Sequence, residues 1–101
     1  MLTIENFLPV VKEKFVLELE GIGKSELELS SVTELPVSSR PDMKRKPFSL
    51  IFEAPLLGPD KNMYLSQRTY RLEHDQLGPL DIFIVPIGPK DGLMRYEAVF
   101  N

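Results

Sequence analysis

Short segments in which apolar and polar residues alternate one by one constrain the fold of this chain more than any other feature. In residues 14–20, the apolar Phe15, Leu17 and Leu19 alternate with polar positions such as Glu18. A period of two puts successive side chains on opposite faces of an extended strand, so that one face is buried and the other meets solvent. The pattern therefore predicts a half-buried β-strand.

Patterns of this kind recur along the chain and predict six short strands. The predicted strands are residues 14–20, 25–35, 48–53, 64–75, 80–87 and 95–101. Segments rich in glycine and proline separate them, which predicts turns and loops. These connections are residues 21–24, 36–47, 54–62, 76–79 and 88–92. The chain is predicted to be mainly β, an antiparallel barrel or a small sandwich, and from Phe48 onward its strands resemble a meander of hairpins.

Two strand segments depart from simple alternation. Leu27 and Leu29 keep the period of two but the residues after them do not, so we expect a β-bulge near residues 30–31. A helix over residues 25–35 is the competing interpretation. Residues 80–87 are almost entirely apolar, which predicts a central strand covered on both faces.

A short helical turn is predicted at residues 3–8, before the first strand. Thr3 is a suitable N-cap, and Ile4 and Phe7 would share one face of the turn. Pro9 should end the helix soon afterwards. We expect this turn to pack as a lid on the core.

Length and composition exclude several classes of protein. A chain of 101 residues fits one domain, residues 1–101. The absence of cysteine excludes disulfides, thiolate catalysis and cysteine metal ligands, and it suits a reducing compartment. A net charge of −3 argues against nucleic-acid binding, which normally needs a surplus of lysine and arginine. We find neither a signal peptide nor the ~20 apolar residues of a membrane span, and we expect a cytoplasmic protein.

Three stretches carry a resemblance to a known family. They are PFSLIFEAP at residues 47–55, YRLEHDQLGPLDIFIVPIGP at 70–89 and YEAVFN at 96–101. Together with LTIENFLP and KFVLELE near the start, they make the chain resemble a small bacterial family known only as a domain of unknown function. The shared motifs are turns, core aromatics and a closing strand, so the resemblance implies no catalytic residue. It does imply an accessory role beside phage-tail-like or surface-fibre systems.

His74 is the only histidine and the one residue around which an acid–base or metal site could be built. It shares a strand face with Tyr70 and Leu72, whereas the neighbouring Glu73 and Asp75 point to the other face and are poor co-ligands. We interpret His74 as a strand-end histidine that hydrogen-bonds into the following turn. A hydrolase or metal enzyme centred on His74 is the weakest of our hypotheses.

Acidic residues give a second set of candidates. Glu18, Glu20, Glu26 and Glu28 alternate with leucines and predict a solvated outer face, which could also be an acidic docking surface. Asp81 begins an apolar strand, and we expect it to pair with a nearby arginine or to cap a turn.

A basic cluster lies in the 36–47 loop and is a candidate interaction site. It consists of Arg40, Lys44, Arg45 and Lys46. Aromatic residues do not interleave with it as they do in surfaces that bind single-stranded nucleic acid. We expect a solvated loop or one that a partner protein orders.

These observations favour a non-enzymatic protein-interaction or structural module that needs no cofactor. It would act through an exposed edge strand, through the basic loop or by self-association. The alternative is a small β-barrel that holds a ligand at its mouth, near Tyr70, His74 and Tyr96.

Overall fold

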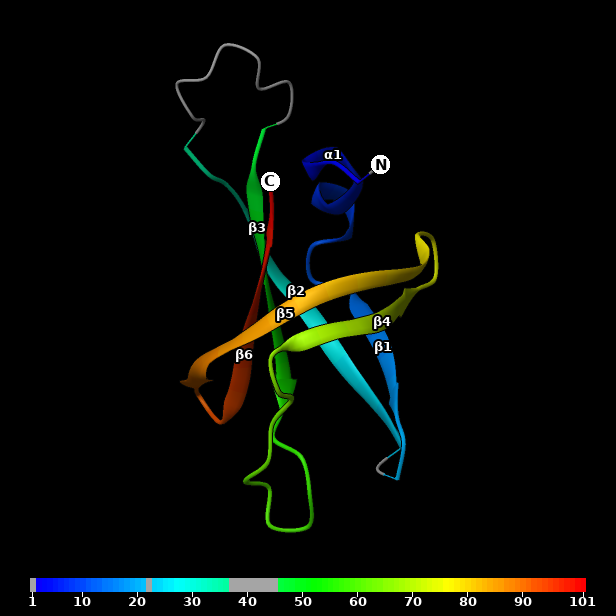
Figure 1. Ribbon diagram of the computed structural model, residues 1–101, viewed down its shortest axis with the longest axis vertical. Coiled ribbons are helices and arrows are strands. Elements are labelled where there is room, and N and C mark those ends of the chain that lie inside the picture. Colours follow the sequence, from blue (N-terminus) through cyan, green and yellow to red (C-terminus); the bar gives the residue numbers. More distant parts are fainter. Residues whose placement is uncertain (1, 22, 37–45) are drawn as a thin grey trace.

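The computed structural model describes residues 2–21, 23–36 and 46–101 and shows a closed antiparallel barrel with the strand order β1-β2-β3-β6-β5-β4 (Figure 1). The elements are α1 (Ile4–Phe7), the 3-10 turn η1 (Leu8–Val10), β1 (Lys14–Leu19), β2 (Gly23–Glu34), β3 (Phe48–Pro55), β4 (Arg68–His74), β5 (Gly78–Lys90) and β6 (Leu93–Phe100). The predicted mainly β antiparallel fold with a short N-terminal helix is confirmed. Between the two predicted architectures, the barrel is the one found.

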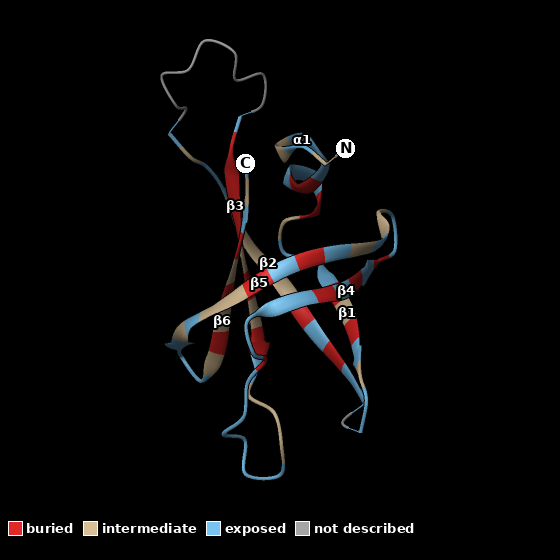
Figure 2. Ribbon diagram, viewed as in Figure 1, coloured by how far each residue is buried: buried red, intermediate tan, exposed pale blue. Residues whose placement is uncertain are grey.

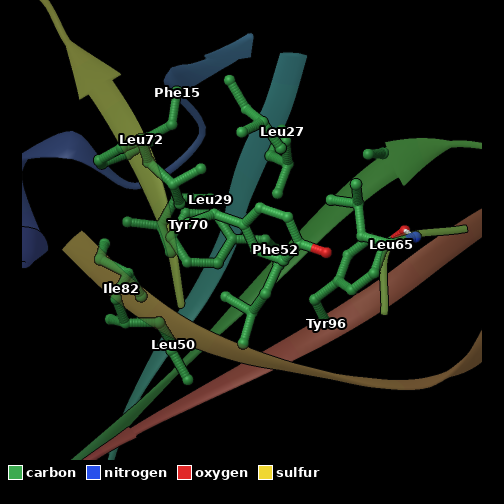
Figure 3. Close-up of a cluster of buried hydrophobic side chains, with 14 of the residues drawn as sticks. Phe15, Leu27, Leu29, Leu50, Phe52, Leu65, Tyr70, Leu72, Ile82 and Tyr96 are labelled. Atoms are coloured by element: carbon green, nitrogen blue, oxygen red, sulfur yellow. Dashed lines mark hydrogen bonds between the residues drawn. The ribbon is translucent and has the colours of Figure 1, made fainter. Parts of the chain in front are cut away.

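Alternate residues of each strand fill the barrel interior (Figures 2 and 3). The largest fully buried side chains are Phe7, Val10, Phe15, Leu27, Leu29, Leu50, Phe52, Leu72, Ile82, Ile84 and Tyr96. Burial of one such side chain contributes about 1.5–3 kcal/mol, so the interior supplies most of the favourable free energy of folding. Phe15 and Leu17 of β1 and Tyr70 and Leu72 of β4 are buried as their alternation predicted, whereas Leu19 at the end of β1 is half-buried.

Opposite ends of the barrel are closed by different segments (Figure 1). At one end α1 and η1 bring in Phe7, which is fully buried with its ring centroid 5.9 Å from that of Phe48. The Thr3 N–H donates to Asn6 Oδ1 at 2.8 Å and holds the first turn of α1. At the other end the 56–67 loop inserts Leu65, which is 4% exposed. The predicted N-terminal lid is therefore confirmed.

Strand β2 is a single bulged strand and not a helix. Its register with β3 shifts between Leu29 and Ser31, so the predicted bulge is confirmed and the competing helix over residues 25–35 is wrong. An extra residue lets a strand bend sharply, and this bend allows β2 to pair with both β1 and β3.

The prediction of a meander from Phe48 onward is wrong for the step from β3 to β4. β3 pairs with β2 and β6, whereas β4 pairs with β5 and β1. The 56–67 loop therefore crosses the end of the barrel instead of forming a hairpin. Alternation reveals which face of a strand is buried, but it carries no information on which strand lies beside it.

The prediction that residues 80–87 are covered on both faces is also wrong. Phe83 is 49% exposed and Ile87 is 40% exposed, whereas Ile82 and Ile84 are buried. A barrel wall has one inner face, so an apolar strand in it leaves half of its side chains outside. β5 also continues to Lys90 through a bulge between Pro86 and Gly88, where residues 88–92 were predicted to be a turn.

Two further boundaries differ from the prediction. Residues 64–67 belong to the loop and not to the fourth strand, which begins at Arg68. The turn between β5 and β6 consists of Asp91 and Gly92 alone, both with positive φ (53° and 81°). Two such residues match the twist of the flanking strands in a tight hairpin.

Barrel closure is weakest between β1 and β4. In the described strands these two are in register at a single pair, Val16 with Glu73, whereas every other neighbouring pair is in register over five or more residues. Figure 1 shows the two strands meeting near the β4–β5 turn and then diverging.

Candidate functional site

His74 lies inside the barrel wall and is hydrogen-bonded on both ring nitrogens. Nε2 is 2.6 Å from Glu13 Oε1, and Nδ1 accepts the backbone N–H groups of Gln76 and Leu77 at 3.1 and 3.3 Å. Because Nδ1 is an acceptor, this arrangement assigns the ring proton to Nε2, which donates to Glu13. The predicted bonding of His74 into the turn that follows its strand is therefore what the geometry shows.

The His74–Glu13 pair is close enough for proton transfer, but its surroundings are those of a structural clasp. The His74 side chain is 3% exposed and its ring lies 4.8 Å from that of Phe15. A general base needs one nitrogen free to face a substrate, and here both nitrogens are engaged. The pair instead joins the segment before β1 to the β4–β5 turn. Among the described residues no group of three or more metal-binding side chains comes together.

Tyr70 and Tyr96 stand inside the barrel and point their hydroxyl groups at the 56–67 loop. The Tyr96 hydroxyl accepts the backbone N–H of Leu65 at 3.0 Å (Figure 3). The Tyr70 hydroxyl donates to the Ser66 carbonyl at 2.9 Å. Burial raises the pKa of Tyr96 above its ordinary value, because the charged phenolate would lose its hydration. These two core residues thus fix the loop from within.

The 56–67 loop also has internal bonds. Leu57 and Met63 form a two-sided bridge, with Leu57 N–H donating to Met63 O at 2.7 Å and Met63 N–H donating to Leu57 O at 3.0 Å. The turn closes at Gly58, whose φ of +88° suits glycine and whose missing Cβ would lie 2.7 Å from Met63 Sδ. The bridge and the turn therefore hold the two sides of the loop together.

This ordered loop carries apolar side chains on its outside. Met63 is 49% exposed and Tyr64 is 54% exposed. Between the loop and the β5–β6 hairpin lies a groove of about 480 Å³. Its lining includes Leu56, Lys61, Tyr64, Pro86, Pro89 and Met94. A mainly apolar groove with an aromatic ring and one lysine at its wall can hold a side chain or short segment of another molecule.

Most of the predicted basic cluster cannot be placed. Arg40, Lys44 and Arg45 lie outside the described residues, and only Lys46 is described. Lys46 is exposed, with its Nζ 3.9 Å from Glu34 Oε1. An exposed pair of this kind contributes little to stability.

The predicted acidic face is found on the outside of β1 and β2. Glu18, Glu20 and Glu26 are exposed, and Glu28 is half-buried beside Lys14 with a separation of 3.6 Å. Asp81 Oδ1 lies 3.4 Å from Arg71 Nε on the neighbouring strand, as the predicted pairing with an arginine requires. Glu18 and Glu20 line one open cavity together with Arg68 and Arg71, whereas Glu26, Glu28 and Asp81 do not line it.

Two features of the site were missed by sequence reasoning. Glu13 was not recognised as the partner of His74, from which it is separated by 61 positions. Met63 and Tyr64 were not recognised as an exposed pair, because residues 64–67 were assigned to a strand. Pro59 and the glycine before it were a usable signal, since they mark the tight turn on which this pair depends.

Comparison with known proteins identifies a family. A family model described as Domain of unknown function (DUF6916) matches residues 2–100. The chain belongs to this family. No curated protein and no solved structure matched the chain in the corresponding searches. Within the described residues, no helix has the length and apolar character needed to cross a membrane.

Proposed function

We propose that this member of the DUF6916 family is a non-enzymatic protein-interaction module whose binding surface is the 56–67 loop with the adjoining β5–β6 hairpin. The observation that carries the proposal is the anchoring of the loop. Hydroxyl groups of the core residues Tyr70 and Tyr96 hold a loop that presents Met63 and Tyr64 to solvent. These bonds satisfy polar groups that face the core, and they also hold the outer side chains of the loop in place.

The composition of this surface suits protein recognition. Tyrosine and methionine are enriched at interfaces, and tyrosine is among the residues that contribute most to binding. The loop is already ordered, so binding costs little conformational entropy. The groove beside Tyr64 offers a place for an apolar side chain of the partner, and Lys61 at its wall can meet a carboxylate.

The enzyme and ligand-barrel alternatives have less support. His74 has both nitrogens engaged and a nearly inaccessible ring, so a hydrolytic role would require the clasp with Glu13 to open. A ligand held among Tyr70, His74 and Tyr96 would have to break hydrogen bonds that these residues already make. The ligand-barrel alternative therefore stays a prediction, as do the cytoplasmic location, the bacterial origin and the accessory role beside phage-tail-like or surface-fibre systems.

Site-specific photo-crosslinking tests the proposal. Tyr64 is replaced by benzoylphenylalanine, an aromatic side chain that the exposed position can accept, and the protein is irradiated in cells of its native host. We expect a defined covalent adduct with one protein. In binding measurements with that purified partner, Tyr64→Ala should raise Kd by roughly 30-fold or more, because this is the effect of losing a tyrosine at the centre of an interface.

Glu26 supplies the matched control, because it is exposed on the outer face of β2. Benzoylphenylalanine at position 26 should give no adduct, and Glu26→Ala should leave Kd within about twofold of the original. Equal crosslinking from both positions, or a partner whose binding does not respond to Tyr64→Ala, would show that the loop is not the binding surface.

A further inference from the structure

A second opening lies where β1 and β4 diverge, and it does not depend on the loop surface proposed above. Their register is set by Val16 opposite Glu73. Continued by two residues, this register would bring Glu18 opposite Arg71, but the pairing stops before that point. A cavity of about 440 Å³ lies along the diverging strands, lined by Leu17 to Glu20 of one and Arg68 to Arg71 of the other. We call this opening the seam.

Backbone groups that have no strand partner among the described residues face the seam. In an antiparallel strand the N–H and C=O of successive residues point alternately to the two sides. Glu73 lies opposite Pro79 of β5, which has no N–H to donate, so the backbone groups of Glu73 face β1 and Val16. By the same alternation, the backbone groups of Arg71 on β4 and of Glu18 on β1 face the seam. Unpaired edges of this kind are the places at which an extended segment of another chain adds to a sheet.

Side chains along the seam select what can enter it. Leu17 and Tyr70 line this cavity from the inner side of the wall, and an added strand that parted β1 from β4 would set its alternate apolar residues against them. On the outside, Glu18 presents a carboxylate and Arg71 a guanidinium. No ion pair joins these two in the described structure, in which Arg71 instead pairs with Asp81. A glutamine between them would donate to Glu18 and accept from Arg71.

The charges argue against a second copy of this chain in the seam. An isologous dimer whose two-fold axis passes through the middle of either seam edge would set Glu18 near its counterpart, or Arg71 near its counterpart. Like charges directly opposite one another destabilise a strand pair. An extended segment of a different protein has no such conflict.

We propose that the seam accepts an extended segment of a partner protein as an added β-strand, with apolar residues at alternate positions and an amide side chain between Glu18 and Arg71. The segment is short, about five residues, because β1 and β4 are themselves short. Its backbone would pair with the groups of Glu18 on one side and with those of Arg71 on the other. The barrel wall would then be continuous.

Amide hydrogen exchange, measured residue by residue by NMR on the unaltered protein, is the first test. In the free protein the N–H groups of Glu18 and Arg71 should exchange freely, while buried neighbours such as Leu17 and Leu72 are protected by β2 and β5. Protection of Glu18 and Arg71 equal to that of their neighbours at low protein concentration would mean that the seam is already closed, which overturns the proposal.

The second test adds a probe, the peptide acetyl-Ser-Val-Gln-Val-Thr-amide at millimolar concentration. We expect the amides of Glu18 and Arg71 to become protected on titration. The same peptide methylated on the backbone nitrogen of its glutamine should bind about tenfold more weakly, since one backbone hydrogen bond is lost. Absence of any protection overturns the proposal, and so do changes confined to Met63 and Tyr64. Protection that rises with protein concentration alone would assign the seam to a second copy instead.

Discussion

Removal of one oxygen atom, in the substitution Tyr96→Phe, tests how the 56–67 loop is held. The phenylalanine ring fills the same space among the core side chains, so no large cavity is created. The lost hydroxyl is the acceptor for the Leu65 N–H at 3.0 Å, in a part of the structure that is buried. That N–H would remain in the interior without a partner.

The size of the effect follows from this orphaned donor. Leaving a buried donor unsatisfied costs about 1–3 kcal/mol, more than the net value of an average hydrogen bond. For a domain of this length, each 1 kcal/mol lowers Tm by roughly 4–8 °C. We therefore expect Tyr96→Phe to lower Tm by at least about 4 °C, with the loss of protection against amide exchange concentrated at Leu65.

Thermal unfolding followed by circular dichroism measures the change, and two other tyrosines provide controls. Tyr70→Phe removes a bond to the carbonyl of the exposed Ser66, which water can replace, so it should cost about 0.5–1.5 kcal/mol. Tyr64→Phe alters an exposed residue and should stay within about 0.5 kcal/mol of the original protein. A Tyr96→Phe variant as stable as Tyr64→Phe would refute the reasoning, because the Leu65 N–H would then not depend on the hydroxyl.

Three further predictions concern other parts of the barrel. Burial raises the pKa of Tyr96, and unfolding returns it to about 10, so the unfolded state loses this proton at lower pH. The free energy of unfolding should therefore fall as pH rises through about 10, with a smaller fall in Tyr96→Phe; equal slopes in urea titrations of the two proteins would contradict this. His74→Ala removes a buried ring and the partner of Glu13 and should cost about 2–4 kcal/mol in urea unfolding, whereas Glu13→Ala, at a half-exposed side chain, should cost less than half of that. Gly58→Ala combines a positive φ with a contact of 2.7 Å to Met63, so it should lower stability by about 1–2 kcal/mol and speed proteolysis within the loop; an unchanged cleavage rate would show that the turn tolerates a side chain.

Several features of this protein could be derived from the amino-acid sequence alone. Phe15 and Leu17, and likewise Tyr70 and Leu72, are two positions apart, and this spacing identified the inner faces of β1 and β4. The loss of alternation after Leu29 located the bulge of β2. These are local properties, because the side-chain direction of an extended residue depends only on its own position in the strand. For the same reason the bonding of His74 into the next turn could be predicted.

Other features were decided by the tertiary structure. The pairing of β3 with β6 sends the 56–67 loop across the barrel end, and only there can the hydroxyl groups of Tyr70 and Tyr96 reach it. Glu13 meets His74 because barrel closure brings β1 beside β4. The outward position of Phe83 likewise follows from closure, which leaves one inner face for an apolar strand. Pairing between distant strands is selected by the free energy of the whole barrel, and a local pattern of residues does not contain that choice.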